Sequence, residues 1–265
     1  MTYSLQGKKV LVTGSSAGIG AALAEGFAAR GATIGICGRR TEKLAEVLTR
    51  VQVHAPESRS WTIDLADLDG IAAFAADVDA QLGGVDVLVN NAGIPKRRHV
   101  TRITPEEAEA VMRINYFSPV RLTLALLPGL IERGGRIVNL SSVAARLGPP
   151  IEASYAASKA AITAFSECMA VDLRDTEVKV HIVNPGVIDT ELFELPDNEP
   201  GFHSSVDALP VEAMVEPVVA MLESGAIESY VPEWFKDVVA GKFQDPDAFI
   251  GGSKAYATQV EADRA

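Results

Sequence analysis

Residues 9–20 read KVLVTGSSAGIG. The first five residues form an apolar segment of strand length, and glycines follow at positions 14, 18 and 20. Glycine lets a backbone approach a pyrophosphate closely, and the N-terminus of a following helix favours the phosphate charge. The spacing G-x-x-x-G-x-G differs from the common G-x-G-x-x-G. The stretch predicts a strand, a nucleotide-binding turn and a helix, with a plain strand-to-helix turn as the alternative.

The same alternation continues over about 185 residues. Apolar segments of strand length are followed by helical patterns, and strands apolar on both faces indicate a parallel sheet covered on both sides. We therefore expect one α/β domain with a doubly wound, mainly parallel sheet, whose ligand lies at the carboxyl ends of the strands. The predicted strands are 9–13, 33–37, 61–63, 85–89, 136–140 and 178–183.

Composition limits the functional classes. The chain has 265 residues, is 48% hydrophobic and carries a net charge of −11, which disfavours nucleic acid because phosphate binding needs clustered cations. The two cysteines, Cys37 and Cys168, are far apart, so no metal site is expected. The N-terminal residues lack the apolar stretch of a signal peptide, and no window of about eighteen apolar residues predicts a membrane span. We expect a cytoplasmic protein.

Polar residues follow the predicted strands. Arg39 and Arg40 come after the second strand, where an acid would bind a ribose 2′-hydroxyl and an arginine accommodates a 2′-phosphate. This favours NADP(H) over NAD(H), unless both arginines are solvated. Asp64 suits either an adenine amino group or a helix cap. The run Asn90-Asn91-Ala92-Gly93 provides small residues where a cofactor can cross the sheet edge.

Tyr155 and Lys159 lie four residues apart in a predicted helix, so their side chains share one face. The cation is expected to lower the phenol pKa, ready for proton exchange. Ser142 follows the fifth strand. Asn115 lies within a predicted helix, where asparagine is a poor helix former, and marks either a kink or a water site.

A rival interpretation uses the same turn. Residues 14–18 also read G-x-S-x-G, the nucleophile elbow of α/β hydrolases, with Ser16 as nucleophile and His181 or His203 as base. The turn follows the first predicted strand, and no oxyanion loop of the His-Gly-Gly-Gly type occurs, so we disfavour this interpretation.

As a set, these motifs resemble the classical short-chain dehydrogenase/reductase family over about residues 7–190. Thr13-Gly14-x-x-x-Gly18-x-Gly20, the Asn-Asn-Ala-Gly run, Asn115, Ser142, Tyr155-x-x-x-Lys159 and Asn184-Pro185-Gly186 agree in order and spacing. The resemblance implies a Rossmann-type fold and a catalytic tetrad of Asn115, Ser142, Tyr155 and Lys159. The expected cofactor contacts are Gly14, Ser16, Gly18, Ile19, Gly20, Arg39, Arg40, Asp64, Leu65, Asn90, Ala92, Gly93, Tyr155, Lys159, Pro185, Gly186, Ile188 and Thr190.

The resemblance also implies a reaction. An NADP(H)-dependent enzyme would interconvert a ketone and a secondary alcohol, with Tyr155 as general acid or base and Ser142 bound to the same oxygen. Lys159 would bind the nicotinamide ribose, and Asn115 would hold a water that relays protons to Lys159. The alternatives are a 3-oxoacyl thioester reductase and an NADP(H)-sensing protein with little turnover. Nucleotide-sugar epimerases are disfavoured because a longer substrate domain is missing.

The C-terminal third should determine the substrate. Residues 189–210 read as an irregular lid, and 211–265 as a helix followed by a hydrophobic flap and tail. The family's closing strand with Asp-Gly-Gly is not found, which favours a homodimer on the long helices over a homotetramer. Arg146 and Lys96-Arg97-Arg98 leave a carboxylate or acyl-carrier substrate open. The expected substrate contacts are mostly apolar, which favours a lipophilic substrate: Ile94, Ala144, Ile151, Leu192, Phe193 and Phe202.

Overall fold

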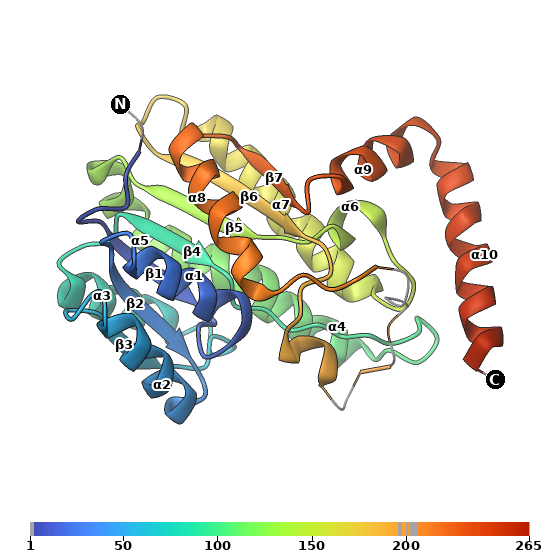
Figure 1. Ribbon diagram of the computed structural model, residues 1–265, viewed down its shortest axis with the longest axis horizontal. Coiled ribbons are helices and arrows are strands. Elements are labelled where there is room, and N and C mark those ends of the chain that lie inside the picture. The colour runs from blue at the N-terminus through green and yellow to red at the C-terminus, as the bar shows by residue number, and fades with distance from the viewer. Residues whose placement is uncertain (1–2, 196–197, 200, 202–205, 265) are drawn as a thin grey trace.

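The protein is described from a computed structural model, which covers residues 3–195, 198–199, 201 and 206–264. These residues form a seven-stranded parallel sheet in the order β3-β2-β1-β4-β5-β6-β7 (Figure 1). The strong apolar character of the central strands explains their complete burial. The prediction of an α/β, doubly wound single domain is confirmed. The strands are β1 (Lys9–Thr13), β2 (Thr33–Gly38), β3 (Arg59–Thr62), β4 (Val87–Asn90), β5 (Arg136–Leu140), β6 (Lys179–Pro185) and β7 (Glu228–Val231).

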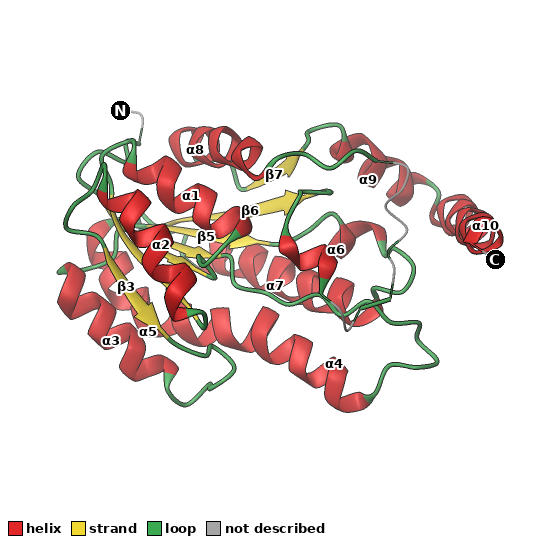
Figure 2. Cartoon of the chain, turned by 60° about the horizontal axis from the view of Figure 1, so that its bottom comes forward, coloured by secondary structure: helices red, strands yellow, loops and turns green. Residues whose placement is uncertain are grey.

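Helices cover both faces of the sheet (Figure 2). One face carries α1 (Gly18–Ala28), α2 (Thr41–Gln52) and α8 (Val215–Ser224), and the apolar core beneath them includes Phe27. The other face carries α3 (Ile71–Leu82), α4 (Pro105–Met112), α5 (Ser118–Arg133) and α7 (Ala153–Asp172), with Leu122 in a second core. Two cores on a shared sheet hold the strand ends, and the loops that follow them, in fixed positions.

The closing strand β7 corrects an expectation. The sequence reading replaced this strand with a hydrophobic flap, whereas Glu228–Val231 pairs in parallel with β6, Pro185 opposite Val231. A cis peptide bond joins Val231 to Pro232, and α9 (Phe235–Gln244) follows. The segment that the sequence assigns to a flap therefore consists of the end of β7, a turn, α9 and the start of a further helix.

The helix from Pro105 to Arg133 changes type in its middle. A capping box begins it, because Thr104 Oγ1 accepts from the Glu107 backbone and the Glu107 carboxylate accepts from the Thr104 backbone. Residues Arg113–Phe117 then form a π-helix (η1) between α4 and α5. By length and mean hydropathy (1.2 in its most apolar window) this helix matches a membrane span, which the sequence reading did not predict. It packs against α3 and α7, and 39% of that window is buried.

The last helix is α10 (Pro246–Arg264), in a segment for which the sequence predicts a flap and tail. Figure 1 shows α10 standing beside the body of the domain, joined to it through α9. The segment after β6 contains a 3-10 helix at Glu191–Glu194 (η2) and a short parallel bridge between Ile188 and Leu209. A second 3-10 helix, Val211–Met214 (η4), leads into α8, and a short helix α6 (Ala144–Leu147) follows β5.

Candidate active site

A cavity of about 700 Å³ lies along the carboxyl ends of the strands. Its lining begins with Arg39 and Arg40 after β2, passes the glycine turn after β1, and reaches Ser142, Tyr155 and Lys159. The segments that follow six strands, β1 to β6, therefore meet in one space. The other expected cofactor residues in its lining are Gly14, Ser16, Gly18, Ile19, Asp64, Leu65, Ala92, Gly93, Pro185, Gly186, Ile188 and Thr190.

The glycine turn is fastened to the loop after β4. Gly14 has a φ of +67°, and a Cβ there would lie 2.7 Å from the Ala92 Cα. Asn91 Nδ2 donates to the carbonyls of Thr13 (2.8 Å) and Gly14 (3.2 Å). A Cβ on Gly20 would lie only 2.4 Å from that same Asn91 nitrogen, and Gly20 is absent from the cavity lining described. The third glycine thus permits close packing of α1, while the first two border the cavity.

Asn115 and Lys159 converge on Gly93. A Cβ built on Gly93 would lie 3.3 Å from Asn115 Oδ1 and 3.4 Å from Lys159 Nζ. Asn115 accepts from the Ile94 amide (2.9 Å) and donates to the Ile94 carbonyl and the Ser158 hydroxyl (3.0 Å each). The π-helix carries this asparagine, in agreement with the kink alternative; π-turns are common at functional sites.

The two serines after β5 have different surroundings. Ser141 Oγ is buried against Thr163 Oγ1 (2.7 Å) and the Lys159 carbonyl (3.2 Å). Ser142 Oγ accepts a hydrogen bond from the Ala144 amide (3.1 Å). The Ser142 hydroxyl also interacts with the Tyr155 phenol and lowers the pKa of that phenol. Ser142 therefore lies beside the tyrosine, and Ser141 holds α7 to the end of β5.

The expected lowering of the Tyr155 pKa by Lys159 is wrong in this structure. Burial raises the Tyr155 pKa to about 12, and the negative charge of Glu152 raises it further against the smaller effect of Ser142. Lys159 Nζ lies 5.8 Å from the centre of the phenol ring and donates to the Leu140 carbonyl (2.7 Å). Burial also lowers the Lys159 pKa to about 8. Desolvation thus acts on both groups more strongly than their mutual attraction.

The comparisons with known proteins agree with this geometry. A family model described as short chain dehydrogenase matches residues 8–199. The chain belongs to the short-chain dehydrogenase family. It is 39% identical over 196 residues to the rat dehydrogenase/reductase SDR family member 7B, covering 71% of this chain and 60% of that protein. It is 35% identical over 224 residues to a short chain dehydrogenase of Pseudocercospora fijiensis, covering 83% of this chain and 70% of that protein.

Solved short-chain dehydrogenases share the fold. One from Streptomyces avermitilis has a TM-score of 0.82 at 30% identity and covers 96% of this chain and 98% of its own. One from Burkholderia cenocepacia, in complex with NADP, has a TM-score of 0.80 at 30% identity, covering 95% and 99%. One from Burkholderia phymatum, in complex with NAD, has a TM-score of 0.84 at 20% identity, covering 93% and 96%.

Some expected site residues of this short-chain dehydrogenase lie elsewhere. Asn90 is buried, and its Nδ2 donates to Thr123 Oγ1 (3.0 Å) and Asn139 Oδ1 (2.8 Å), so it braces β4 against α5 and β5 instead of facing the cofactor. Ile151 has a φ of +58° in a turn, outside the described cavity lining. Ile94, Ala144 and Leu192 line the cavity. The Phe193 side chain and Phe202 lie outside the described residues.

Asp64 is not the helix cap that one alternative predicted, because the next helix, α3, begins at Ile71 with Gly70 as its N-cap. Its carboxylate accepts the Ala66 amide (3.0 Å) within a turn, and the residue lines the cavity beside Leu65.

The C-terminal helices add walls to the cavity of the dehydrogenase. Phe249, Ser253 and Tyr256 from α10 form its outer wall, and Phe235 from α9 lies near Gly186. Phe235 and Phe249 belong to the predicted hydrophobic flap, whereas Ser253 and Tyr256 are not among the expected site residues. The spacing of Phe249, Ser253 and Tyr256 is that of one helix face, which is the signal that could have identified them. A second missed feature is the buried ion pair between Arg97 Nε and Glu152 Oε1, 2.8 Å, in the cavity wall.

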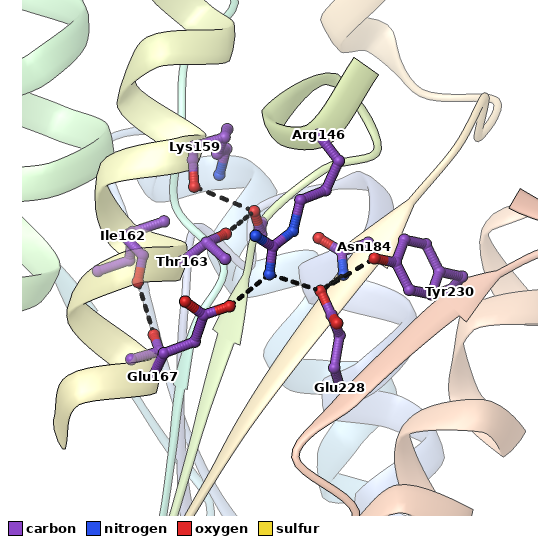
Figure 3. Close-up of polar contacts among 10 residues, drawn as sticks. Arg146, Lys159, Ile162, Thr163, Glu167, Asn184, Glu228 and Tyr230 are labelled. Atoms are coloured by element: carbon purple, nitrogen blue, oxygen red, sulfur yellow. Dashed lines mark hydrogen bonds and ion pairs between the residues drawn. The ribbon is translucent and has the colours of Figure 1, made fainter. Parts of the chain in front are cut away.

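The basic residues considered for an acidic substrate are engaged with acids of the dehydrogenase itself. Lys96 and Arg98 both pair with Glu107 (3.0 and 3.3 Å), and Arg97 pairs with Glu152. Figure 3 shows the Arg146 guanidinium between Glu167 on α7 and Glu228 on β7, with Asn184 and Tyr230 also bonded to Glu228. This network joins α6 to α7, β6 and β7.

Among the described residues, Ser16 has no histidine partner of the kind that the hydrolase interpretation requires. Ser16 Oγ accepts from Arg40 Nε (3.1 Å) and Nη2 (2.9 Å). His181 is fully buried in β6, its Nδ1 is 2.6 Å from the Ala226 carbonyl, and burial lowers its pKa to about 4. His203 lies outside the described residues.

Proposed function

We propose that this dehydrogenase interconverts a ketone and a secondary alcohol, with NADP(H) as its cofactor and a lipophilic substrate. One observation carries the proposal: a continuous cavity has Arg39 and Arg40 at one end and Ser142, Tyr155 and Lys159 at the other. Its length suits a dinucleotide that extends from a cationic end to a proton-donating end. The solved relatives named above include one with NADP and one with NAD.

The residues present suit the cofactor. The left-handed backbone of Gly14 and Gly18, at φ +67° and +60°, leaves room for a pyrophosphate at the start of α1. Arg39 is exposed, lines the cavity and makes no ion pair within the described part of the chain, so its guanidinium is available for a 2′-phosphate. Lys159 would bind the nicotinamide ribose. When bound, the cofactor supplies or accepts the hydride.

Reduction would use the tyrosine as an acid. A pKa of about 12 keeps Tyr155 protonated at neutral pH, so it carries the proton that the substrate oxygen needs as negative charge develops there. Ser142, beside it, would donate a hydrogen bond to the same oxygen. Asn115 Oδ1 and Lys159 Nζ both approach Gly93, which supports the proposal that Asn115 would hold a water that relays protons to Lys159.

The substrate end favours an apolar molecule. Its described walls include Leu147, Leu195, Val206, Phe235 and Phe249. The basic residues that would recognise a carboxylate or an acyl carrier are engaged in ion pairs with Glu107, Glu152, Glu167 and Glu228. We therefore place a lipophilic ketone before a 3-oxoacyl thioester.

The test is NADPH oxidation, followed by absorbance, with aromatic and steroid-like ketones and with short and long 3-oxoacyl thioesters. NADH is run in parallel at equal concentration. Turnover of apolar ketones with a preference for NADPH supports the proposal. Turnover confined to thioesters, or a preference for NADH, contradicts it, and cofactor binding without turnover of either class supports the sensing alternative.

A further inference from the structure

An acidic side chain occupies the cation cluster near the start of α2. Glu191 Oε2 accepts from Arg40 Nη1 at 2.5 Å, and Glu191 Oε1 forms an ion pair with Lys43 Nζ. Arg40 also donates from Nε and Nη2 to Ser16 Oγ, so its guanidinium binds both the glycine turn and Glu191. Two cations from the start of α2 thus meet one carboxylate from the segment after β6.

Glu191 reaches this cluster from the opposite side of the cavity. It follows Thr190, which lines the cavity after β6, and it begins the 3-10 helix Glu191–Glu194. Ser16, Arg40 and Glu191 all line the cavity that contains the proposed cofactor site. The carboxylate therefore contacts cations that border the place assigned to the adenosine end of the cofactor.

A carboxylate and a phosphate are recognised in the same way by these groups. A guanidinium and an ammonium donate short, charge-assisted hydrogen bonds to either anion. The three side chains are about half exposed, at 45% for Arg40, 43% for Lys43 and 50% for Glu191, so these contacts can exchange with a ligand at modest cost.

We propose that Glu191 is a specificity-determining residue, which competes with the 2′-phosphate of NADP(H) for Arg40 and Lys43. This inference rests on the proposed NADP(H) site. A cofactor without the 2′-phosphate leaves the Glu191 contacts in place, whereas NADP(H) must replace them. Glu191 thus reduces the preference for NADP(H) that Arg39, Arg40 and Lys43 would otherwise give.

The competing charge is permanent in the working pH range. The hydrogen bonds from Lys43 and then Arg40 lower the Glu191 pKa to about 2, so the carboxylate stays ionised at any pH at which the enzyme is assayed. Glu191 therefore contributes the same charge throughout the neutral pH range, and the competition weakens with salt.

The test compares Glu191→Gln with the native chain by calorimetric titration of NADPH and NADH. Each exposed pair is worth up to about 1 kcal/mol, so we expect the Kd for NADPH to fall by about fivefold while the Kd for NADH stays within about twofold. Glu212→Gln is the matched control, because Glu212 lines the same groove as Glu191 and Lys43 and its loss removes one equal charge.

Adenosine 2′,5′-bisphosphate and 5′-AMP isolate the phosphate itself. The inference requires that Glu191→Gln tighten the bisphosphate alone, and that Glu212→Gln change neither. Weaker NADPH binding by Glu191→Gln, or equal gains for NADPH and NADH, would overturn it. If native protein binds NADPH well and Glu191→Gln leaves both affinities unchanged, only this inference fails. If native protein and variant alike bind NADH and not NADPH, the proposed cofactor fails as well.

Discussion

Tyr155 keeps its proton because it is desolvated beside an acid. Burial and Glu152 raise its pKa to about 12, while Lys159, the expected partner, donates to the Leu140 carbonyl. The sequence motif predicts that a tyrosine and a lysine share one helix face. It does not predict that the carboxylate of Glu152, three residues earlier, lies close enough to Tyr155 to raise its pKa. The direction of this pKa shift could be found only from the folded structure.

Tyr155→Phe should reduce ketone reduction by about 10²–10⁴-fold, because the proton donor is lost. The aromatic ring remains without its hydroxyl, so NADPH affinity should stay close to that of the native protein. Single-turnover rates and NADPH titration separate the two effects. Unchanged turnover would remove Tyr155 from its role.

Lys159 should set an alkaline limit to activity. Its pKa is lowered to about 8, so its cation is present below that pH and lost above it, whereas Tyr155 stays protonated throughout. We expect kcat/KM for reduction to fall as pH rises through about 8. Lys159→Arg, whose guanidinium stays charged, should remove that fall in whatever activity it retains. An unchanged midpoint in this variant would contradict the assignment.

The same lowered pKa of Lys159 should also affect the free energy of unfolding, with a pH dependence opposite to that of activity. The native chain holds fewer protons on Lys159 than the unfolded chain between about pH 8 and the ordinary pKa of 10.5. This group's contribution is therefore present in full above about 10.5 and is lost as pH falls through about 8.

The Arg97–Glu152 pair should matter strongly for stability. Both side chains are buried, at 4% and 8% exposed, so Arg97→Met leaves a buried carboxylate and should cost about 3–5 kcal/mol in the free energy of unfolding. The double variant with Glu152→Met removes both charges and should recover much of that loss. Urea unfolding of the native protein, the two single variants and the double variant measures the coupling energy between the two side chains. Additive losses in the free energy of unfolding would show that the two side chains do not interact.

At the scale of elements, apolar runs predicted the strands β1 to β6 and the helices between them. β7 was missed because Glu228, Ser229 and Tyr230 are half-buried at the sheet edge and lack an apolar pattern. α10 was missed because Gly251 and Gly252 are poor helix formers, and its one inward face is supported by tertiary contacts. Most of the motif residues line the described cavity, although Gly20 and Asn90 do not, while the positions of Glu191 and the α10 wall depend on contacts between segments distant in sequence.

The wall from α10 should affect substrate more than cofactor. Phe249→Ala and Tyr256→Ala remove side chains that line the outer cavity, so we expect KM for an apolar ketone to rise by about tenfold, since the contact of one half-buried aromatic side chain is worth about 1.4 kcal/mol. NADPH affinity should be unchanged. Ile250→Ala, on an exposed part of the same helix, is the control. Equal effects of all three variants would indicate general loosening of α10.

At the scale of the whole molecule, the long helix presents an apolar stripe to solvent. Phe117, Leu124 and Ile131 recur every seven residues and are 48%, 54% and 40% exposed. We propose that a second copy of the chain covers this stripe, which accounts for a helix that is apolar yet only partly buried.

Leu124→Glu should therefore shift the protein from dimer to monomer, because a charge would be buried at the centre of the contact. Sedimentation velocity measures this directly. Val53→Glu, at an exposed site at the end of α2, should leave the assembly unchanged. A native protein that sediments as a monomer at micromolar concentration would rule out this contact.

The π-helix Arg113–Phe117 makes the number of residues in the long helix matter to the candidate site, because it carries Asn115. Deleting one residue there would allow an uninterrupted α-helix, which by itself is the better hydrogen-bonded form. A π-turn holds one residue more than an α-turn, so α4 and α5 could keep their present directions after the deletion, while the residues of the turn itself would lose theirs. Asn115 could then no longer bind the backbone of Ile94 as it does now. The extra residue thus serves the direction of one side chain and leaves the two flanking helices where a regular helix would put them.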